Sequence, residues 1–302
     1  MKMDNIPLQI VGQAVKFYRL MPIKALTPQL KKIYFRFLNS GGKRSLVIKE
    51  IEGVNFELDL TEVIDSAMYY ESTREPDTSQ ALRKLCKPGS TVFDIGANVG
   101  SHALPMARDV GPQGRVYAFE PVPWAVNKLK RNLELNRFGN LVLESIALSD
   151  VNEIDVQMEF RASFKIGAGL GVSQDGRINS GWWNECDQIK IQMQTLDSYV
   201  SSHQITGVDL IKLDVDGFEG KVIRGALETL KRFHPIIIME IAPAWTKMRG
   251  DNIADILQQL TELGYGFYTE VGFNRIDNIM DRINCLAPDG GFNVVASTRV
   301  PI

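Results

Sequence analysis

Apolar and polar residues follow two different periods along this chain of 302 residues. Residues 45–51 and 54–60 alternate at every second position and are joined by a Glu-Gly pair, which predicts a β-hairpin. Residues 208–213 and 235–241 are near-continuous apolar runs, as expected of strands buried on both faces of a sheet. Stretches of helical period separate such runs after residue 90. The pattern therefore predicts an α/β fold.

The alternation favours a mostly parallel, seven-stranded, Rossmann-like sheet with helices on both faces. A Lys-Pro-Gly stop signal ends the first of the helices. One stretch, residues 161–187, is rich in Gly, Ser and Asn and is too long for an ordinary connection, so we expect an insertion there. Strands are expected at 91–95, 115–119, 141–147, 208–213, 235–241, 265–269 and 292–297, and helices at 76–87, 99–110, 124–136, 218–233 and 251–263.

The N-terminal segment differs from the rest in charge. Residues 1–45 hold nine basic residues and one acid, a net charge of +8, whereas the whole chain has a net charge of −2. Its apolar residues fall at helical spacing, so residues 1–44 are expected to form basic amphipathic helices. Either they contact an anionic membrane surface as a peripheral anchor, or they pack as a helical cap on the catalytic domain. Residues 45–89 would lead into a catalytic domain spanning 90–302.

Composition excludes several classes of protein. A net charge of −2 gives no general case for binding nucleic acid. The three cysteines are widely spaced and form no C-x-x-C pair, which argues against a zinc site and a disulfide framework and favours the reducing cytoplasm. Apolar runs are too short to span a bilayer, and the N-terminus is not typical of a signal peptide.

Candidate chemistry begins where the strand at residues 91–95 ends. Gly96, Ala97, Asn98 and Gly100 form a turn into a helix, where glycines allow close backbone approach and the helix N-terminus offers free N–H groups. The G-x-x-x-G spacing departs from the dinucleotide fingerprint, G-x-G-x-x-G. Asp94 would repel a pyrophosphate but suits an ammonium and a sulfonium group. The loop therefore favours S-adenosylmethionine over NAD.

The next two strand ends extend this candidate site. Glu120, followed by Pro121, ends the second strand and can accept hydrogen bonds from both hydroxyls of a ribose. Ser145, Ile146 and Ala147 end the third strand, where adenine would lie against small and apolar groups. Ligands of open parallel sheets bind at such carboxyl ends, near the point where the strand order reverses.

The fourth strand ends in three carboxylates, Asp214, Asp216 and Glu219. Asp214 and Asp216 are the candidates for a general base or for orienting the acceptor, and Asp214 also for holding the cofactor amine. Glu219 is a candidate for substrate binding, but Asp216 and Glu219 equally fit the capping of the helix that follows. Magnesium chelation by these acids is a further alternative; we assign no metal.

Three other residues are candidates for contact with the acceptor. Glu71 follows two tyrosines and is expected to close over the site or to be an ordinary exposed acid. Trp182 and Trp183 would offer flat faces to a sugar ring, or would form a buried pair that anchors the insertion.

These motifs together resemble the FkbM-like methyltransferases. The resemblance covers about residues 70–245 and implies a class I methyltransferase fold that uses S-adenosylmethionine, with O-methylation of a hydroxyl on a sugar, glycolipid or related metabolite. It places Asp94, Gly96, Asn98, Gly100 and Glu120 on the cofactor and Asp214 at the reacting centre. The matching segments are 94–100, 119–121, 147–149, 195–197, 211–217 and Glu240, which ends the fifth strand and is a candidate for substrate binding.

Three functions are therefore compared. An O-methyltransferase acting on a small-molecule or glycan acceptor agrees with the strand-end residues and with the resemblance. A non-catalytic, cofactor-binding or membrane-docked partner protein would use the basic segment at 1–44. A nicotinamide dehydrogenase is disfavoured by the glycine spacing and by Asp94.

Overall fold

The structure is a computed structural model in which the chain divides into two compact units. The first is Met1–Arg74 with Glu159–Gln188, and the second is Glu75–Met158 with Ile189–Ile302. The predicted N-terminal helices and almost all of the predicted insertion lie outside the described residues. The structure describes residues 46–59, 62–73, 75–160, 187–288 and 290–301.

In the first unit, strands β1 (Leu46–Ile51) and β2 (Val54–Asp59) form an antiparallel hairpin, as predicted. Glu52 and Gly53 in the turn have φ angles of 52° and 79°, which suit the right-handed twist of the two strands. Every second residue of β2 is buried, and helix α3 (Val63–Glu71) packs against this strand. The sequence pattern did not predict α3.

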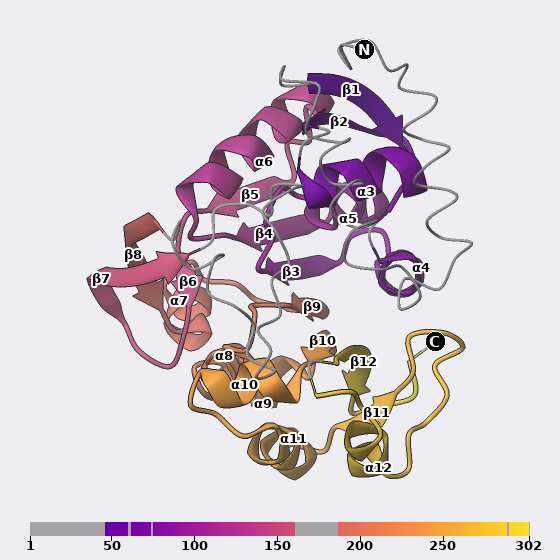
Figure 1. The fold of residues 1–302 in the computed structure, drawn as a ribbon, viewed down its shortest axis with the longest axis vertical. Helices are drawn as coiled ribbons and strands as arrows, with labels where there is room; N and C mark the ends of the chain where they lie inside the picture. Colours follow the sequence, from indigo (N-terminus) through magenta and orange to yellow (C-terminus); the bar gives the residue numbers. More distant parts are fainter. Residues whose placement is uncertain (1–45, 60–61, 74, 161–186, 289, 302) are drawn as a thin grey trace, which may run out of the picture. The chain divides into compact units, whose positions relative to one another are not determined.

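The second unit contains a seven-stranded sheet with the order β11-β12-β10-β9-β3-β4-β5 (Figure 1). Neighbouring strands are parallel, except that β12 runs antiparallel to β10 and β11. The chain proceeds outward from β3 to β5 on one side and from β9 on the other, so the order reverses between β3 and β9. The predicted sheet is confirmed. Its strands are β3 (Thr91–Ile95), β4 (Arg115–Phe119), β5 (Leu141–Glu144), β9 (Leu210–Leu213), β10 (Ile236–Ile241), β11 (Gly266–Tyr268) and β12 (Phe292–Ser297).

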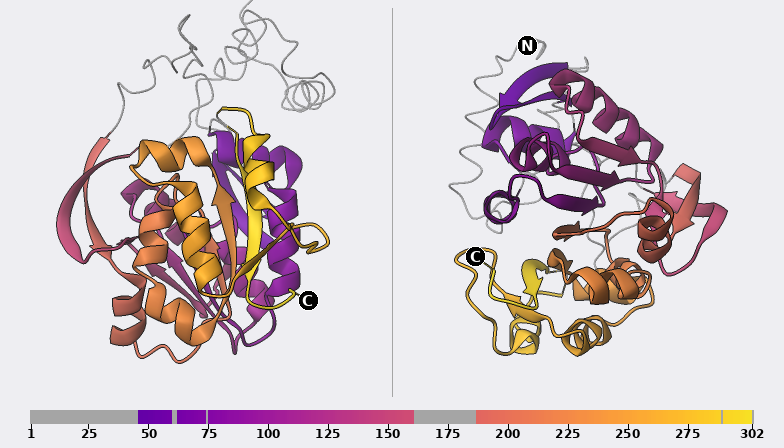
Figure 2. Two further views of the ribbon diagram at one scale, coloured as in Figure 1. Left: turned by 90° about the horizontal axis from the view of Figure 1, so that it is seen from below. Right: turned by 180° about the vertical axis from the view of Figure 1, so that it is seen from behind.

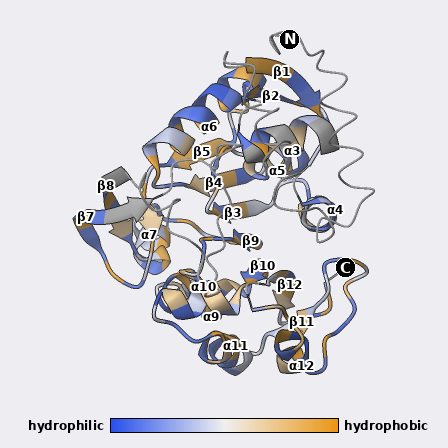
Figure 3. Ribbon diagram, in the orientation of Figure 1, coloured by the Kyte–Doolittle hydropathy of each residue, from blue (hydrophilic) through white to orange (hydrophobic). Residues whose placement is uncertain are grey.

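Helices cover both faces of this sheet (Figure 2). On one face α5 packs on β3, β4 and β5 and contacts α4. Among the other helices, α7 contacts α9, and α8 contacts α11. The exposed sides of α4 and α6 are largely hydrophilic (Figure 3). The helices are α4 (Pro76–Leu85), α5 (Ala103–Val110), α6 (Pro123–Asn136), α7 (Leu196–Ser202), α8 (Glu219–Arg224), α9 (Leu227–Phe233), α10 (Pro243–Met248), α11 (Ile253–Glu262) and α12 (Ile279–Asn284).

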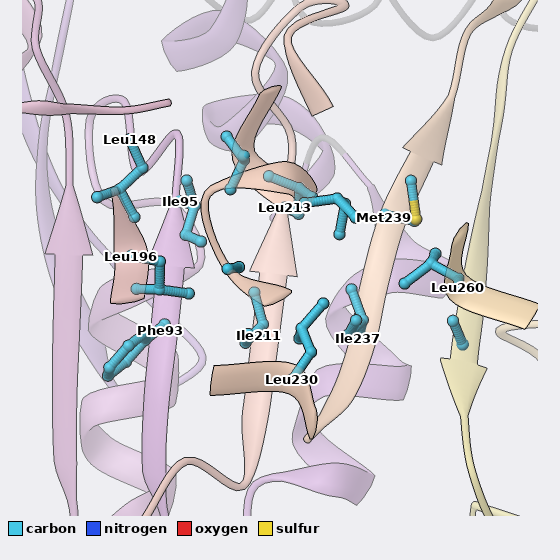
Figure 4. Close-up of a cluster of buried hydrophobic side chains, with 14 of the residues drawn as sticks. Phe93, Ile95, Leu148, Leu196, Ile211, Leu213, Leu230, Ile237, Met239 and Leu260 are labelled. Atoms are coloured by element: carbon cyan, nitrogen blue, oxygen red, sulfur yellow. The ribbon is translucent and has the colours of Figure 1, made fainter. Parts of the chain in front are cut away.

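The core between the sheet and one helical layer determines which strand residues face the other side. Successive strand side chains point to opposite faces. Asp94, Lys212 and Glu240 each lie between two members of this core, so all three belong to the opposite face of the sheet. The core includes Phe93, Ile95, Leu148, Leu196, Ile211, Leu213, Leu230, Ile237, Met239 and Leu260 (Figure 4).

The helix predicted at residues 218–233 is two helices, α8 and α9, so this prediction was wrong. The break falls at Gly225, where a Cβ atom would lie only 1.9 Å from the carbonyl oxygen of Ser149. The chain bends there because another backbone segment lies against it. Helices α7, α10 and α12 were not predicted.

The third strand of the sheet is also shorter in the structure than the predicted range of 141–147. Strand β5 ends at Glu144, and the chain continues into β6 (Ala147–Leu148) of a separate sheet with the order β6-β8-β7. Its other strands, β7 (Glu153–Phe160) and β8 (Asp187–Gln194), were not predicted. Among the described residues, no helix is long and apolar enough to cross a membrane.

Candidate active site

The turn after β3 is shaped by close backbone packing. The amides of Gly96 and Ala97 both donate to the carbonyl oxygen of Phe119, at 3.0 Å each. Gly96 has a φ of 87°, and a Cβ atom there would lie 1.9 Å from the carbonyl oxygen of Asp214. Only glycine fits this position, because a side chain would collide with backbone in an already unfavourable conformation. The turns after β3 and β9 therefore touch.

Lys212 links acidic side chains at the ends of these two strands. Asp94 and Lys212 are register partners on neighbouring strands, and both are buried, at 0% and 5% exposure. The Lys212 Nζ atom lies 3.8 Å from Oδ1 of Asp94 and 3.1 Å from Oδ2 of Asp214. Burial opposes the charge on Lys212, but the carboxylates of Asp214 and Asp94 outweigh it and raise the lysine pKa above its usual value. The ammonium group therefore stays charged.

The loop has hydrogen-bonding atoms that a ligand can satisfy. Both carboxylate oxygens of Asp94 and the amide oxygen of Asn98 are buried and have no hydrogen-bond partner among the described residues. Burial raises the pKa of Asp94, while the charge on Lys212 lowers it. Unsatisfied buried acceptors are rare and call for a partner. An ammonium group and hydroxyls, both present in S-adenosylmethionine, supply such donors, so these residues fit the predicted cofactor.

Glu120 lies immediately after β4 and is only 6% exposed. Its two oxygens accept hydrogen bonds from the amides of Asn98 and Val122, at 2.8 and 2.9 Å. Burial raises the pKa of Glu120 to about 7 and outweighs the opposing effect of these two hydrogen bonds. A carboxylate has about four lone-pair sites, so both oxygens can still accept from ribose hydroxyls. Glu120 thus joins the glycine turn of β3 to the end of β4.

The residues predicted to contact adenine lie between β5 and β6. Ile146 is buried, at 8% exposure, whereas Ser145 is exposed and Ala147 begins β6. Glu144 at the end of β5 accepts a hydrogen bond of 2.9 Å from the Tyr199 hydroxyl. Strand β5 ends at Glu144, so Ser145 and Ile146 lie in the connection to β6 rather than in the large sheet.

The acidic turn after β9 separates its three carboxylates into different environments. The Asp214 side chain is 28% exposed, and Asp216 is exposed with a φ of 51°. Glu219 is 1% exposed and accepts hydrogen bonds from the amides of Val215 (3.0 Å) and Gly217 (3.3 Å). These contacts hold the turn before α8, whose N-cap residue is Phe218 and makes no side-chain cap hydrogen bond. Asp214 and Asp216 are the carboxylates of this turn that a ligand can reach.

Gly217 fixes the acidic turn against the next strand connection. Its φ is 94°, and a Cβ atom there would lie 2.6 Å from the carbonyl oxygen of Trp245 in α10. The Arg249 guanidinium lies 4.6 Å from the centre of the Phe218 ring, and its Nε is 3.5 Å from the carbonyl oxygen of Asp216. Helix α10 and the turn after β9 are therefore packed together.

Glu240 is on β10, next to Asp214. Leu213 pairs with Met239 in the parallel register, so Asp214 and Glu240 occupy neighbouring positions one residue further along. No hydrogen bond or ion pair to the Glu240 carboxylate occurs among the described residues. Burial raises the pKa of Glu240 to about 7, and the charges of Asp214, Glu219, Asp216 and Glu75 add to this effect.

The positions of three predicted acceptor side chains are not described by the structure. Glu71 is the last residue of α3 in the first unit, and its side chain lies outside the described residues. Trp182 and Trp183 also lie outside them. In the part of the chain that the structure describes, no group of three or more His, Cys, Asp or Glu side chains is arranged to hold a metal ion.

Sequence reasoning assigned no role to Lys212 or Asn132. Asn132 on α6 is fully buried and donates a hydrogen bond of 3.0 Å to the carbonyl oxygen of Val99, which supports the turn after β3 (residues 94–100), the candidate cofactor loop. A lysine inside the apolar run 208–213 was a visible signal, since buried lysines are rare without a partner. Asn132, one polar residue on an amphipathic helix, gave no comparable signal.

The model of the FkbM methyltransferase domain matches residues 94–267, more than half of the 302 residues. The chain belongs to the FkbM methyltransferase family. The match begins at Asp94 and includes both the cofactor loop and the acidic turn. The protein is therefore an S-adenosylmethionine-dependent methyltransferase with a class I fold, as predicted.

Three relatives illustrate the family. The 2-O-methyltransferase NoeI of Sinorhizobium fredii is 28% identical over 177 residues, which cover 54% of this chain and 70% of that protein. The hexuronic acid methyltransferase AglP of Haloferax volcanii is 23% identical over 201 residues, or 67% of this chain and 77% of the relative. The 31-O-demethyl-FK506 methyltransferase FkbM of Streptomyces tacrolimicus is 26% identical over 159 residues, covering 46% and 60% of the two chains.

Proposed function

We propose that this methyltransferase transfers the methyl group of S-adenosylmethionine to a hydroxyl oxygen of a sugar or a sugar-containing acceptor. The observation that carries the proposal is the contact between the cofactor loop and the acidic turn. Gly96 has no room for a side chain because the backbone of Asp214 lies against it. The carboxylates after β9 are therefore beside the loop that holds the cofactor.

The arrangement suits a hydroxyl acceptor. Exposed carboxylates such as Asp216 can accept hydrogen bonds from the hydroxyl groups of a sugar, and the partly exposed Asp214 can orient the reacting hydroxyl. The sulfonium cofactor supplies an activated methyl group, so orientation of the acceptor provides much of the acceleration. The names of NoeI and FkbM denote O-methyl transfer, and that of AglP denotes a sugar acid as its substrate.

The proposal is tested by mass spectrometry of glycans and glycolipids from cells with and without the gene. We expect one methyl ether to disappear from a sugar when the gene is removed and to return when the wild-type gene is restored. The Asp214→Asn gene should restore little of it, because the amide cannot keep the ion pair with Lys212. An unchanged glycan and glycolipid profile, with a methylated product found in another class of molecule, would refute the sugar acceptor.

A further inference from the structure

The carboxylates after β9 and at the end of β10 differ in their hydrogen-bond partners. Asp214 accepts a hydrogen bond of 3.1 Å from the Lys212 ammonium, and Glu219 accepts from two backbone amides. A proton placed on Asp214 would cost the ion pair with Lys212, and a proton on Glu219 would disturb the turn. Neither carboxylate is well suited to accept a proton during the reaction.

Glu240 has neither restraint. No hydrogen bond or ion pair to its carboxylate occurs among the residues that the structure describes. It belongs to the same face of the sheet as Asp94 and Lys212, one strand from Asp214. A Cβ atom on Gly291 would lie 3.4 Å from Oε1 of Glu240, so the absence of a side chain there leaves space beside the carboxylate.

We infer that Glu240 is the proton acceptor of the reaction and that Asp214 positions the acceptor hydroxyl. The inference rests on the proposed O-methyl transfer. The Glu240 carboxylate takes the hydroxyl proton as the acceptor oxygen forms its bond to the methyl carbon. The methyl–sulfur bond breaks, its electron pair stays on sulfur, and the products are the methyl ether, S-adenosylhomocysteine and protonated Glu240.

The charges around Glu240 support this role. Asp214 on β9, Asp216 and Glu219 in the turn, and Glu75 before α4 all face it with negative charge. On the other side it pairs in register with the neutral Asn293 of β12, whose amide donates to Thr78 rather than to Glu240. Burial and these acids raise the pKa of Glu240 to about 7, where a general base accepts a proton readily and is regenerated at neutral pH.

The first test of the inference does not use turnover. The full-length protein is labelled with ¹³C at its glutamate carboxyl carbons, saturated with S-adenosylhomocysteine and titrated between about pH 5 and 9. We expect a carboxyl resonance that titrates near neutral pH in the wild type and in Asp214→Asn and is missing in Glu240→Gln. Glu120 gives a second candidate resonance, so the Glu240→Gln spectrum is needed for the assignment. If Glu240→Gln removes no resonance that titrates in this range, the inference is wrong.

The second test measures transfer of labelled methyl from S-adenosylmethionine to a glycan extract of cells that lack the gene. We expect Glu240→Gln to lower the rate by about 10²–10⁴-fold and to abolish its rise with pH below neutrality. Asp214→Asn should lower the rate but keep that rise, and Glu240→Asp should restore part of it. The exposed Glu134→Gln on α6 is the matched control and should behave as the wild type.

The outcomes separate the inference from the proposed function. Labelling by the wild type and equal labelling by Glu240→Gln would leave the proposed function standing and overturn the role of Glu240. If the wild type labels no component of the extract, the proposed function fails, and the role of Glu240 fails with it. Calorimetry with S-adenosylhomocysteine should show equal affinity for Glu240→Gln and wild type. A lost affinity would show that Glu240 acts in cofactor binding and would also overturn the inference.

Discussion

At the ends of β3 and β4 the carboxylates are almost completely buried, whereas two carboxylates at the ends of β9 and β10 are exposed or partly exposed. Glu120 accepts hydrogen bonds from two backbone amides, and Asp94 is fully buried beside Lys212. Asp216, in contrast, is exposed, and Glu240 has no partner among the described residues. The first region has the preorganised geometry expected for a constant cofactor. The second offers acids that a ligand can reach, as expected for chemistry on an acceptor that differs between relatives.

The most severe test of the cofactor region is Gly96→Ala. The methyl group would be placed 1.9 Å from a backbone oxygen, at a φ of 87° that alanine tolerates poorly. Such strain costs about 1–3 kcal/mol before the collision is relieved. We expect the affinity for S-adenosylhomocysteine, measured by calorimetry, to fall by about 100-fold, or about 3 kcal/mol.

The control for this variant is Gly139→Ala. A Cβ atom there meets nothing within 4 Å, and its φ is outside the left-handed region. Circular dichroism should show both variants folded at the temperature of the titration. An unchanged affinity in Gly96→Ala would mean that the contact between the two turns does not shape the cofactor site.

A smaller effect is expected for Glu120→Gln. The amide keeps the shape of the side chain but removes the negative charge that two ribose hydroxyls would meet, and hydrogen bonds to charged groups contribute about 1.5–3 kcal/mol. Affinity for S-adenosylhomocysteine should fall by about 10-fold or somewhat more. Glu134→Gln, on the exposed side of α6, should leave it unchanged. Equal affinities in all three proteins would remove the ribose role from Glu120.

The smallest effect concerns stability and pH. Burial raises the pKa of Glu240 from 4.5 to about 7 in the folded protein. The folded state therefore binds more protons than the unfolded state between these values, and the stability contribution, full below about pH 4.5, is lost as pH rises through about 7. We expect the melting temperature to fall less between pH 5 and 8 in Glu240→Gln than in the wild type.

Thermal unfolding followed by circular dichroism at the two pH values measures this difference. The exposed Glu134→Gln should follow the wild type. If Glu240→Gln lost as much stability as the wild type over the same range, the carboxylate would not be titrating there, and the contrast between the two regions would weaken.

Much of the sheet could be predicted because buried strands need apolar runs. Strands β4 and β12 have the bounds that the pattern predicted. Helix bounds were less accurate where backbone contacts decide them. Helix α5 begins at Ala103 rather than at Val99, because the intervening residues form the turn that Asn132 supports. The break at Gly225 depends on Ser149, which is distant in sequence, and no local pattern shows such a contact.

For the candidate site, too, the sequence predicts positions better than the contacts made there. Asp94, Gly96 and Glu120 follow from their places at strand ends, since parallel strands bring those ends to one edge. The different roles of the acids after β9 and β10 do not follow, because they depend on burial and on partners. Glu219 accepts hydrogen bonds from backbone amides and Asp214 from Lys212, whereas Glu240 has no partner among the described residues. That distinction requires the register of β3, β9 and β10.

Parallel calorimetric titrations of the full-length protein with S-adenosylmethionine and with NAD test the central claim most directly. We expect saturable binding of one equivalent of S-adenosylmethionine and no measurable binding of NAD, because the carboxylate of Asp94 would attract the ammonium and sulfonium groups of the first and repel the pyrophosphate of the second. Tighter binding of NAD, or binding of neither molecule, would contradict the assignment of the turn after β3 as the cofactor site.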